Sequence, residues 1–196
     1  MKWATAIRTL KDLALAANQV ADSSYTLPVT QLWAAWEILG KPQDDLAWVT
    51  VGVVVDLPVD EVAWLTKPRG AEHWEYSTRA AKMPAVTLWR SAHAPVWNHW
   101  LDRPAQFWDH ETGLAEDVLD ALRAGKGEDV RAPAPSEDEF RARQQDDIAV
   151  SLKAVRERTR TYEERRWKPG KLTAVSDPLW EATNGYVDLV DGERGE

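Results

Sequence analysis

The sequence predicts an α+β protein with a small mixed sheet, flanking helices and a helical C-terminal part. Two observations carry this prediction. Residues 46–57, LAWVTVGVVVDL, are rich in β-branched side chains and apolar at both parities, which predicts a central strand covered on both faces. Beyond residue 136, apolar residues recur at helical spacing. We expect residues 1–130 to form an α/β core and residues 136–192 a helical subdomain packed on it.

Two helices are expected before this strand. Residues 3–20 carry apolar side chains at helical spacing, with charges between them. Pro28 stands where the first position of a helix would be, and Gly40 where a helix would end. Residues 29–39 therefore predict a second helix.

The rest of the core is predicted from the same periodicities. Its elements are a short helix opened by Pro58, a helix or helical turn over 71–82, a strand over 85–92, one or two strands over 95–109 with a break at Pro104, and a helix over 113–127.

Residues 128–135, EDVRAPAP, form a proline-containing linker and mark the expected subdomain boundary. Ser136 and Glu139 have the spacing of a capping box, which predicts the start of a long helix that runs to Trp167. A last helix is expected to begin near Ser176.

Composition narrows the functional classes. The net charge of −8 disfavours nucleic acid as the main partner. The absence of Cys excludes disulfides and cysteine-ligated zinc. No apolar run approaches 18 residues, so we expect no membrane association, and we place the protein in the cytoplasm because residues 1–20 lack the pattern of a signal peptide.

Tryptophan is over-represented, with 12 residues against two phenylalanines. Most of these rings could belong to the core. Alternatively, several could line a pocket or a partner surface, where tryptophan is favoured.

Acidic residues around strand 46–57 are the first candidates for chemistry. Asp56 ends the strand, where ligands bind in open α/β sheets, and Asp44 and Asp45 precede it. Carboxylates at such a position could bind Mg²⁺. However, Asp44 and Asp45 are adjacent, and Asp56 lies roughly 35 Å farther along an extended chain. These three aspartates are therefore weak catalytic candidates, and Asp60 and Glu61 suit the first turn of a helix.

Histidines offer a second possibility. His93 and His99 would share a face of a strand, but they would lie roughly 20 Å apart, and His110 follows later. We expect no metal site and no resident cofactor, with Mg²⁺ required only if the protein is an enzyme.

Basic and aromatic side chains are the strongest candidates for binding. Arginine and tryptophan together can stack a base or grip a protein partner, and arginine clusters suit phosphate. The candidate residues are Arg90, His93, Trp97, His99, Trp100 and Arg103 in the predicted strands, and Arg160, Arg165 and Arg166 near the end of the long helix. Cross-strand pairs and a solvated helix face remain the alternatives.

Several catalytic signatures are absent from the sequence. It contains no G-x-x-x-x-G-K-[ST], G-x-G-x-x-G, G-x-S-x-G or H-E-x-x-H motif.

The stretches VTVGVVVDLPVDEVAWL, LWRSAHAPVWNHW and RTRTYEERRWKPGKL resemble those of a family of uncharacterised actinobacterial proteins, over nearly the whole chain. This resemblance implies a fold and a lineage, since the family has no assigned activity.

The order of elements also resembles the plan of the nucleotidyltransferase superfamily, which has a Gly-Ser motif after a helix and two aspartates at alternate strand positions. Here Lys41 follows Gly40, the aspartates Asp44 and Asp45 are adjacent, and residues 85–92 contain none. This resemblance implies a nucleotidyltransferase-like core without the usual catalysis.

We therefore expect a non-catalytic module that binds a partner protein or a small phosphate-bearing ligand. One alternative is an active Mg²⁺-dependent nucleotidyl or phosphoryl transferase. Another is a structural homo-oligomer whose long helix packs against its twin through Leu152 and Val155.

Overall fold

The computed structural model describes residues 1–21, 23 and 27–194. It contains a five-stranded sheet in the order β3-β2-β1-β4-β5, in which β2 and β3 are parallel and the other neighbours antiparallel. The elements are α1 (Trp3–Val20), β1 (Val29–Ala35), β2 (Val49–Val55), α2 (Ala71–Ser77), β3 (Ala85–Ser91), β4 (Ala105–Asp109), β5 (Gly113–Leu114), α3 (Glu116–Arg123), α4 (Glu137–Arg165) and α5 (Thr173–Arg194). The predicted α+β class, with a mixed sheet and C-terminal helices, is confirmed.

Strand β2 forms inside the predicted range 46–57, and every one of its residues is buried. It lies between β1 and β3, so it has no free edge. Its alternating valines Val49, Val51, Val53 and Val55 pack with α1 on one face of the sheet, and Val54 packs on the other face. Burial on both faces explains why both parities are apolar.

The predicted helix over 29–39 is wrong. Residues 29–35 form β1, the middle strand, and residues 36–39 form a 3₁₀ turn. Leu32 and Trp33 lie on opposite faces of this strand and pack into different apolar clusters. A strand that is apolar on both faces can show the same spacing of apolar residues as a helix. Pro28 does not open a helix but extends the pairing of β1 with β2, because its carbonyl accepts the Asp56 N–H at 2.8 Å.

The prediction for residues 95–109 is only partly right. Strand β4 begins directly after Pro104, but residues 95–104 form no strand. Within that segment, the side-chain oxygen of Asn98 accepts the N–H groups of Trp100 and Leu101, and Arg103 has a φ of 43°. These turns replace the ladder bonds that a strand needs.

Most of the other predicted helices form, with shifts at their ends. The helix expected after Pro58 is only a 3₁₀ turn at Val59–Glu61, and the helix expected over 113–127 is shortened to α3, with β5 before it. Helix α1 covers the predicted residues, and both hydrogen bonds of the Ser136–Glu139 capping box are present at the start of α4. The predicted helix over 71–82 is split into α2 and a 3₁₀ turn at 80–82. Helix α5 begins at Thr173, before the predicted start, so Pro178 lies inside it, where a proline removes one backbone hydrogen bond.

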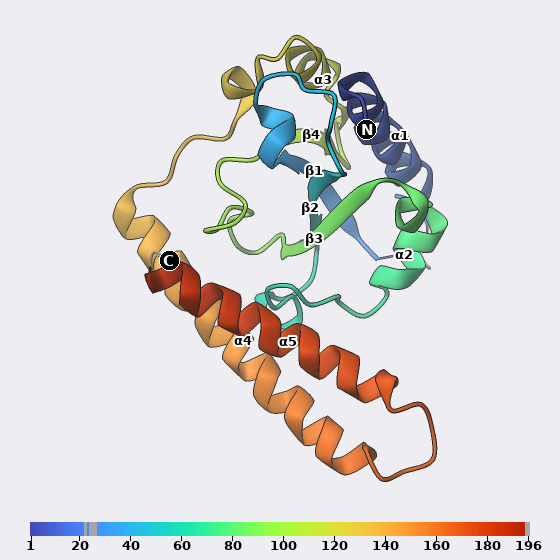
Figure 1. The fold of residues 1–196 in the computed structure, drawn as a ribbon, viewed down its shortest axis with the longest axis vertical. Coiled ribbons are helices and arrows are strands. Elements are labelled where there is room, and N and C mark those ends of the chain that lie inside the picture. Colours follow the sequence, from blue (N-terminus) through green and yellow to red (C-terminus); the bar gives the residue numbers. More distant parts are fainter. Residues whose placement is uncertain (22, 24–26, 195–196) are drawn as a thin grey trace.

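The elements form three layers (Figure 1). Helices α1, α2 and α3 contribute to the apolar cluster on one face of the sheet. Leu189 of α5 and Ile148 of α4 contribute to the cluster on the other face. Helices α4 and α5 form an antiparallel hairpin whose tip, near residues 166–172, projects away from the sheet (Figure 1).

The structure does not confirm a nucleotidyltransferase plan, because the segment before Gly40 that should be a helix begins as strand β1. The division into a core and a helical subdomain stays a prediction. Leu152 and Val155 are half-buried on α4, which packs along α5 of its own chain, and the homo-oligomer alternative stays a prediction. Among the described residues, no helix has the length and hydropathy of a membrane span.

Candidate functional site

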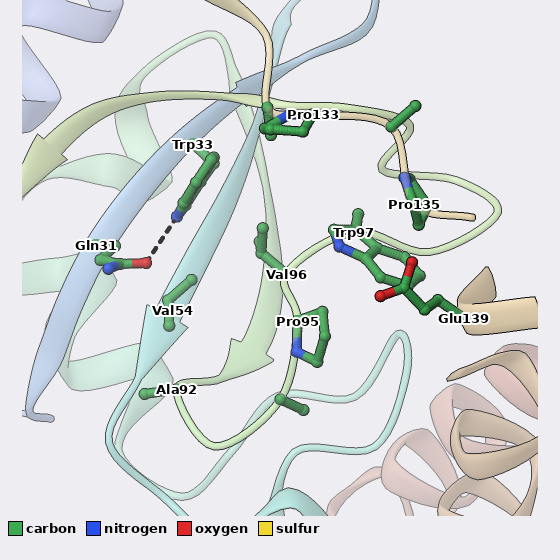
Figure 2. A pocket seen from close by; sticks show the side chains of 13 residues that line it. Gln31, Trp33, Val54, Ala92, Pro95, Val96, Trp97, Pro133, Pro135 and Glu139 are labelled. Atoms are coloured by element: carbon green, nitrogen blue, oxygen red, sulfur yellow. Dashed lines mark hydrogen bonds between the residues drawn. The ribbon is translucent and has the colours of Figure 1, made fainter. Parts of the chain in front are cut away.

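A hollow of about 480 Å³ lies between β1, the segment that follows β3 and the linker that precedes α4 (Figure 2). Its walls are largely apolar, with tryptophan and proline as the bulky side chains. They include Trp33, Pro95, Trp97, Pro133 and Pro135. Three segments that are distant in the sequence therefore build one apolar surface.

A second hollow, of about 560 Å³, adjoins the first. Both are lined by Pro95, Trp97 and Glu139, and the second adds His93 and Asp146. We call the two hollows together the Trp97 cleft. Its size suits a peptide segment or a small ligand.

A hydrogen-bonded chain fixes one wall of the cleft. The indole N–H of Trp33 donates to the side-chain oxygen of Gln31 at 3.0 Å, as Figure 2 shows. The amide of Gln31 donates to Asp109 at 3.3 Å, and Gln106 donates to the same carboxylate oxygen at 2.9 Å. The Trp33 ring is therefore held in place before anything binds.

The opposite wall belongs to α4. Trp97 stacks on Phe140, with ring centroids 6.2 Å apart and planes 13° from parallel. Next to this stack, the carboxylate of Glu139 accepts hydrogen bonds from the Ser136 side chain and backbone, and these bonds lower the pKa of Glu139. Asp146 is exposed about two turns farther along. The rim of the cleft is therefore acidic.

A buried ion cluster lies beneath the second hollow and fastens α4 to the sheet. Arg90 of β3 bonds Asp147 of α4 through both carboxylate oxygens, at 3.0 and 3.4 Å, and Arg143 bonds it at 2.7 Å. The side chains of Arg90 and Asp147 are 1% and 5% exposed. Burial and the charge of Arg90 lower the pKa of Arg143, because two guanidinium groups share a single carboxylate.

A second polar cluster fastens α5. Asp188 accepts hydrogen bonds from the indole of Trp64 at 2.7 Å and contacts His99 Nε2 at 2.8 Å. Burial acts to raise the pKa of Asp188, but the bonds from His99 and Trp64 outweigh it and hold the pKa below its ordinary value of 3.8.

This lowered pKa predicts an acid-sensitive docking of α5. The stabilisation is fully present above pH 3.8 and is lost as the pH falls through the lower pKa of folded Asp188. In urea unfolding measured from about pH 7 to about pH 3, we expect the stability difference between wild type and Asp188→Asn to shrink below about pH 4. Asp191→Asn, exposed on the same helix, should keep the wild-type profile. If the stability difference between wild type and Asp188→Asn did not change with pH, the role assigned to Asp188 would be contradicted.

The structure separates the three candidate aspartates. Asp44 accepts the backbone N–H of Trp3 at 3.3 Å, and Asp45 is exposed in the same loop before β2. Asp56 lies after the other end of β2 and pairs with His93 at 2.8 Å, both side chains being 58% exposed. The carboxyl ends of the parallel strands β2 and β3 bring this last pair together. The aspartates therefore do not converge.

The remaining acidic and histidine candidates are also dispersed. Asp60 pairs with Lys153 at 2.6 Å, and its pKa is lowered by that bond. His99 faces Asp188, while the backbone of His110 bonds the carbonyl of Thr30 after β4. Across the described part of the chain, no group of three or more histidine and acidic side chains is arranged to hold a metal ion.

Of the six strand candidates for binding, two line the cleft, His93 and Trp97. Arg90 is in the interior, where it bonds Asp147. Trp100 forms a half-exposed pair with Trp36, whose ring centroid is 4.5 Å away. Arg103 bonds the carbonyl of Ala132 at 3.3 Å and so positions the linker.

At the hairpin tip, Arg165 and Arg166 line a hollow of about 390 Å³, together with Lys168 and Lys171. Arg160 does not line it. The end of α4 therefore brings two of the three predicted arginines together.

Sequence reasoning missed the linker and the β1 residues that complete the cleft. Gln31 and Trp33 were assigned to a helix, and Pro133 and Pro135 to a connection without function.

The family model for a domain of unknown function, DUF7711, matches residues 1–195. No curated protein and no solved structure matches the chain. Because the match covers nearly the whole length, the chain belongs to the DUF7711 family.

Proposed function

We propose that this protein is a cytoplasmic, non-catalytic binding module whose Trp97 cleft takes a short segment of a partner protein. The observation that carries the proposal is the apolar double hollow around Trp97, built from segments that converge from three parts of the chain. Proline and tryptophan walls offer a large contact area and lose little side-chain entropy on binding.

The acidic rim indicates which segment would fit. Glu139 and Asp146 line the cleft, and Asp56 lies beside the lining residue His93. Arg143 also lines it, but its guanidinium is bonded to Asp147 and its side chain is only 9% exposed. The accessible charge is therefore negative. It complements an apolar segment that carries a lysine or arginine, which would also lie well against the Trp97 ring.

Selection of peptides from a random display library against the purified protein tests this proposal. We expect the selected peptides to combine apolar residues with a lysine or arginine. Trp97→Ala should weaken their binding by about tenfold or more, because a central tryptophan typically contributes 1.4 kcal/mol or more, about the free energy of a tenfold change. Fluorescence anisotropy with a labelled peptide measures the change.

Two control variants distinguish peptide binding in the cleft from non-specific binding. Trp48→Ala removes a ring that is 53% exposed and does not line the cleft, so peptide binding should stay unchanged. Glu139→Gln keeps the hydrogen-bonding shape of the capping box and should weaken mainly the peptides with a basic residue. Selected peptides that bind Trp97→Ala as tightly as wild type would refute the proposed site.

A further inference from the structure

The tip of the α4–α5 hairpin holds an unusual concentration of positive charge. The hollow of about 390 Å³ is lined by Arg165, Arg166, Lys168 and Lys171, with Leu172 and Val175 at its side. No acidic residue is among the residues that line it. The chain as a whole has 32 acidic against 24 basic residues, so this local excess runs against the overall charge.

These four cations are also unpaired. Some exposed basic side chains elsewhere have carboxylate partners, as Lys11 has Glu116 and Lys153 has Asp60, whereas Arg156 and Arg160 of the same helix form no ion pair among the described residues. Within the described residues, none of the four tip cations forms an ion pair, although Glu163 and Glu164 are close in sequence. Four like charges around one small hollow repel one another, and an anion bound between them would remove that repulsion.

The turn between α4 and α5 brings the four basic side chains of the tip close together. Gly170 has a φ of 143°, a conformation that side-chain-bearing residues rarely adopt, and this turn reverses the chain between α4 and α5. The guanidinium of Arg166 lies over the rings of Trp167 and Tyr162, at 4.6 and 5.8 Å from their centroids. Stacking of this kind limits the motion of the arginine and leaves its N–H groups free to donate.

We propose that the hairpin tip binds a small phosphate-bearing ligand with at least two phosphate groups. Arginine donates paired hydrogen bonds to phosphate oxygens, and lysine adds point charges. This site is separate from the Trp97 cleft and does not depend on its function.

Calorimetric titration with pyrophosphate, at low ionic strength and without a divalent metal, tests the proposal. We expect one binding event per chain. The double variant Lys168→Gln/Lys171→Gln should weaken binding by about tenfold or more, since it removes two of the four positive charges that line the hollow. Urea unfolding should show that this variant is as stable as wild type, because both side chains are exposed.

A matched control removes the same amount of charge outside the hollow. Arg156→Gln/Arg160→Gln lies on the exposed part of the same helix and should change the dissociation constant by about twofold or less. Equal losses in both double variants would mean diffuse attraction to net charge and would overturn the proposal. Absence of pyrophosphate binding would also overturn the proposal. If the protein then sedimented with phosphatidylserine vesicles, the tip would be assigned to a lipid surface.

Discussion

Replacing Asp147 by Asn is expected to lower the free energy of unfolding by about 3 to 5 kcal/mol. Asp147 is the single carboxylate between the buried guanidinium groups of Arg90 and Arg143. Without its charge, two cations would face each other in the interior with no anion between them. Removing one partner of a buried ion cluster is costly for this reason, even where the intact cluster adds little net stability. Urea unfolding followed by circular dichroism gives the change.

The adjacent residue supplies the control for this prediction. Asp146→Asn makes the same chemical change one position along α4, at an exposed side chain, and should alter stability by about 0.5 kcal/mol or less. A triple variant, Arg90→Met/Arg143→Met/Asp147→Leu, removes the whole cluster and should be close to wild type in stability. If Asp147→Asn matched Asp146→Asn, the cluster would have no role in docking α4 to the sheet.

The parts of the fold that could be predicted are those set by local pattern. Strand β2 is β-branched at every position except Gly52, and the capping box of α4 needs only Ser136 and Glu139. Strand β1 could not be predicted in this way. Its apolar residues are buried on both faces by partners that are remote in sequence, such as Val53 opposite Leu32. Periodicity alone cannot tell such a strand from a buried helix.

The buried face of α4 shows a second limit. The spacing of apolar residues along α4 predicts a buried stripe of Phe140, Ile148, Leu152, Val155 and Tyr162, with Gln144 and Thr159 on the same line, and the five apolar residues are half-buried. The fully buried positions are instead polar: Arg143, Gln144, Asp147 and Ser151. A polar side chain can be buried where a partner satisfies it, as Asp147 is by Arg90, and such partners cannot be found from hydropathy.

Only part of the Trp97 cleft could be predicted from the sequence, for the same reason. Trp97 and His93 could be singled out because aromatic and basic residues cluster in one stretch. That Trp33 and the linker at 132–135 complete the cleft depends on the tertiary fold. Arg90 is a binding candidate by residue type and yet is buried, because a guanidinium can pair with a carboxylate of a packed helix as well as with a ligand.

The second large effect is expected at Gly185, where α5 crosses the segment after β2. A Cβ atom added there would lie 2.0 Å from the carbonyl oxygen of Trp64, which is backbone and cannot rotate away. Ala is favoured over Gly inside a helix by about 1 kcal/mol, so an unhindered Gly185→Ala change would stabilise the protein. The clash should outweigh this gain and lower the free energy of unfolding by about 2 to 3 kcal/mol, because overpacking against a fixed group displaces the helix.

The sign of this change distinguishes close helix docking from a loosely attached hairpin. Asn184→Ala alters the neighbouring, exposed position and should stabilise by about 0.5 kcal/mol through helix propensity alone. If α5 is held against the core as closely as Gly185 and Trp64 indicate, the two alanine variants must move urea midpoints in opposite directions. If the urea midpoints of both variants rose, α5 would not be packed closely against the core in solution. The bond between Trp64 and Asp188, one turn along the same helix, would then not form, and the acid sensitivity expected from Asp188 would disappear as well.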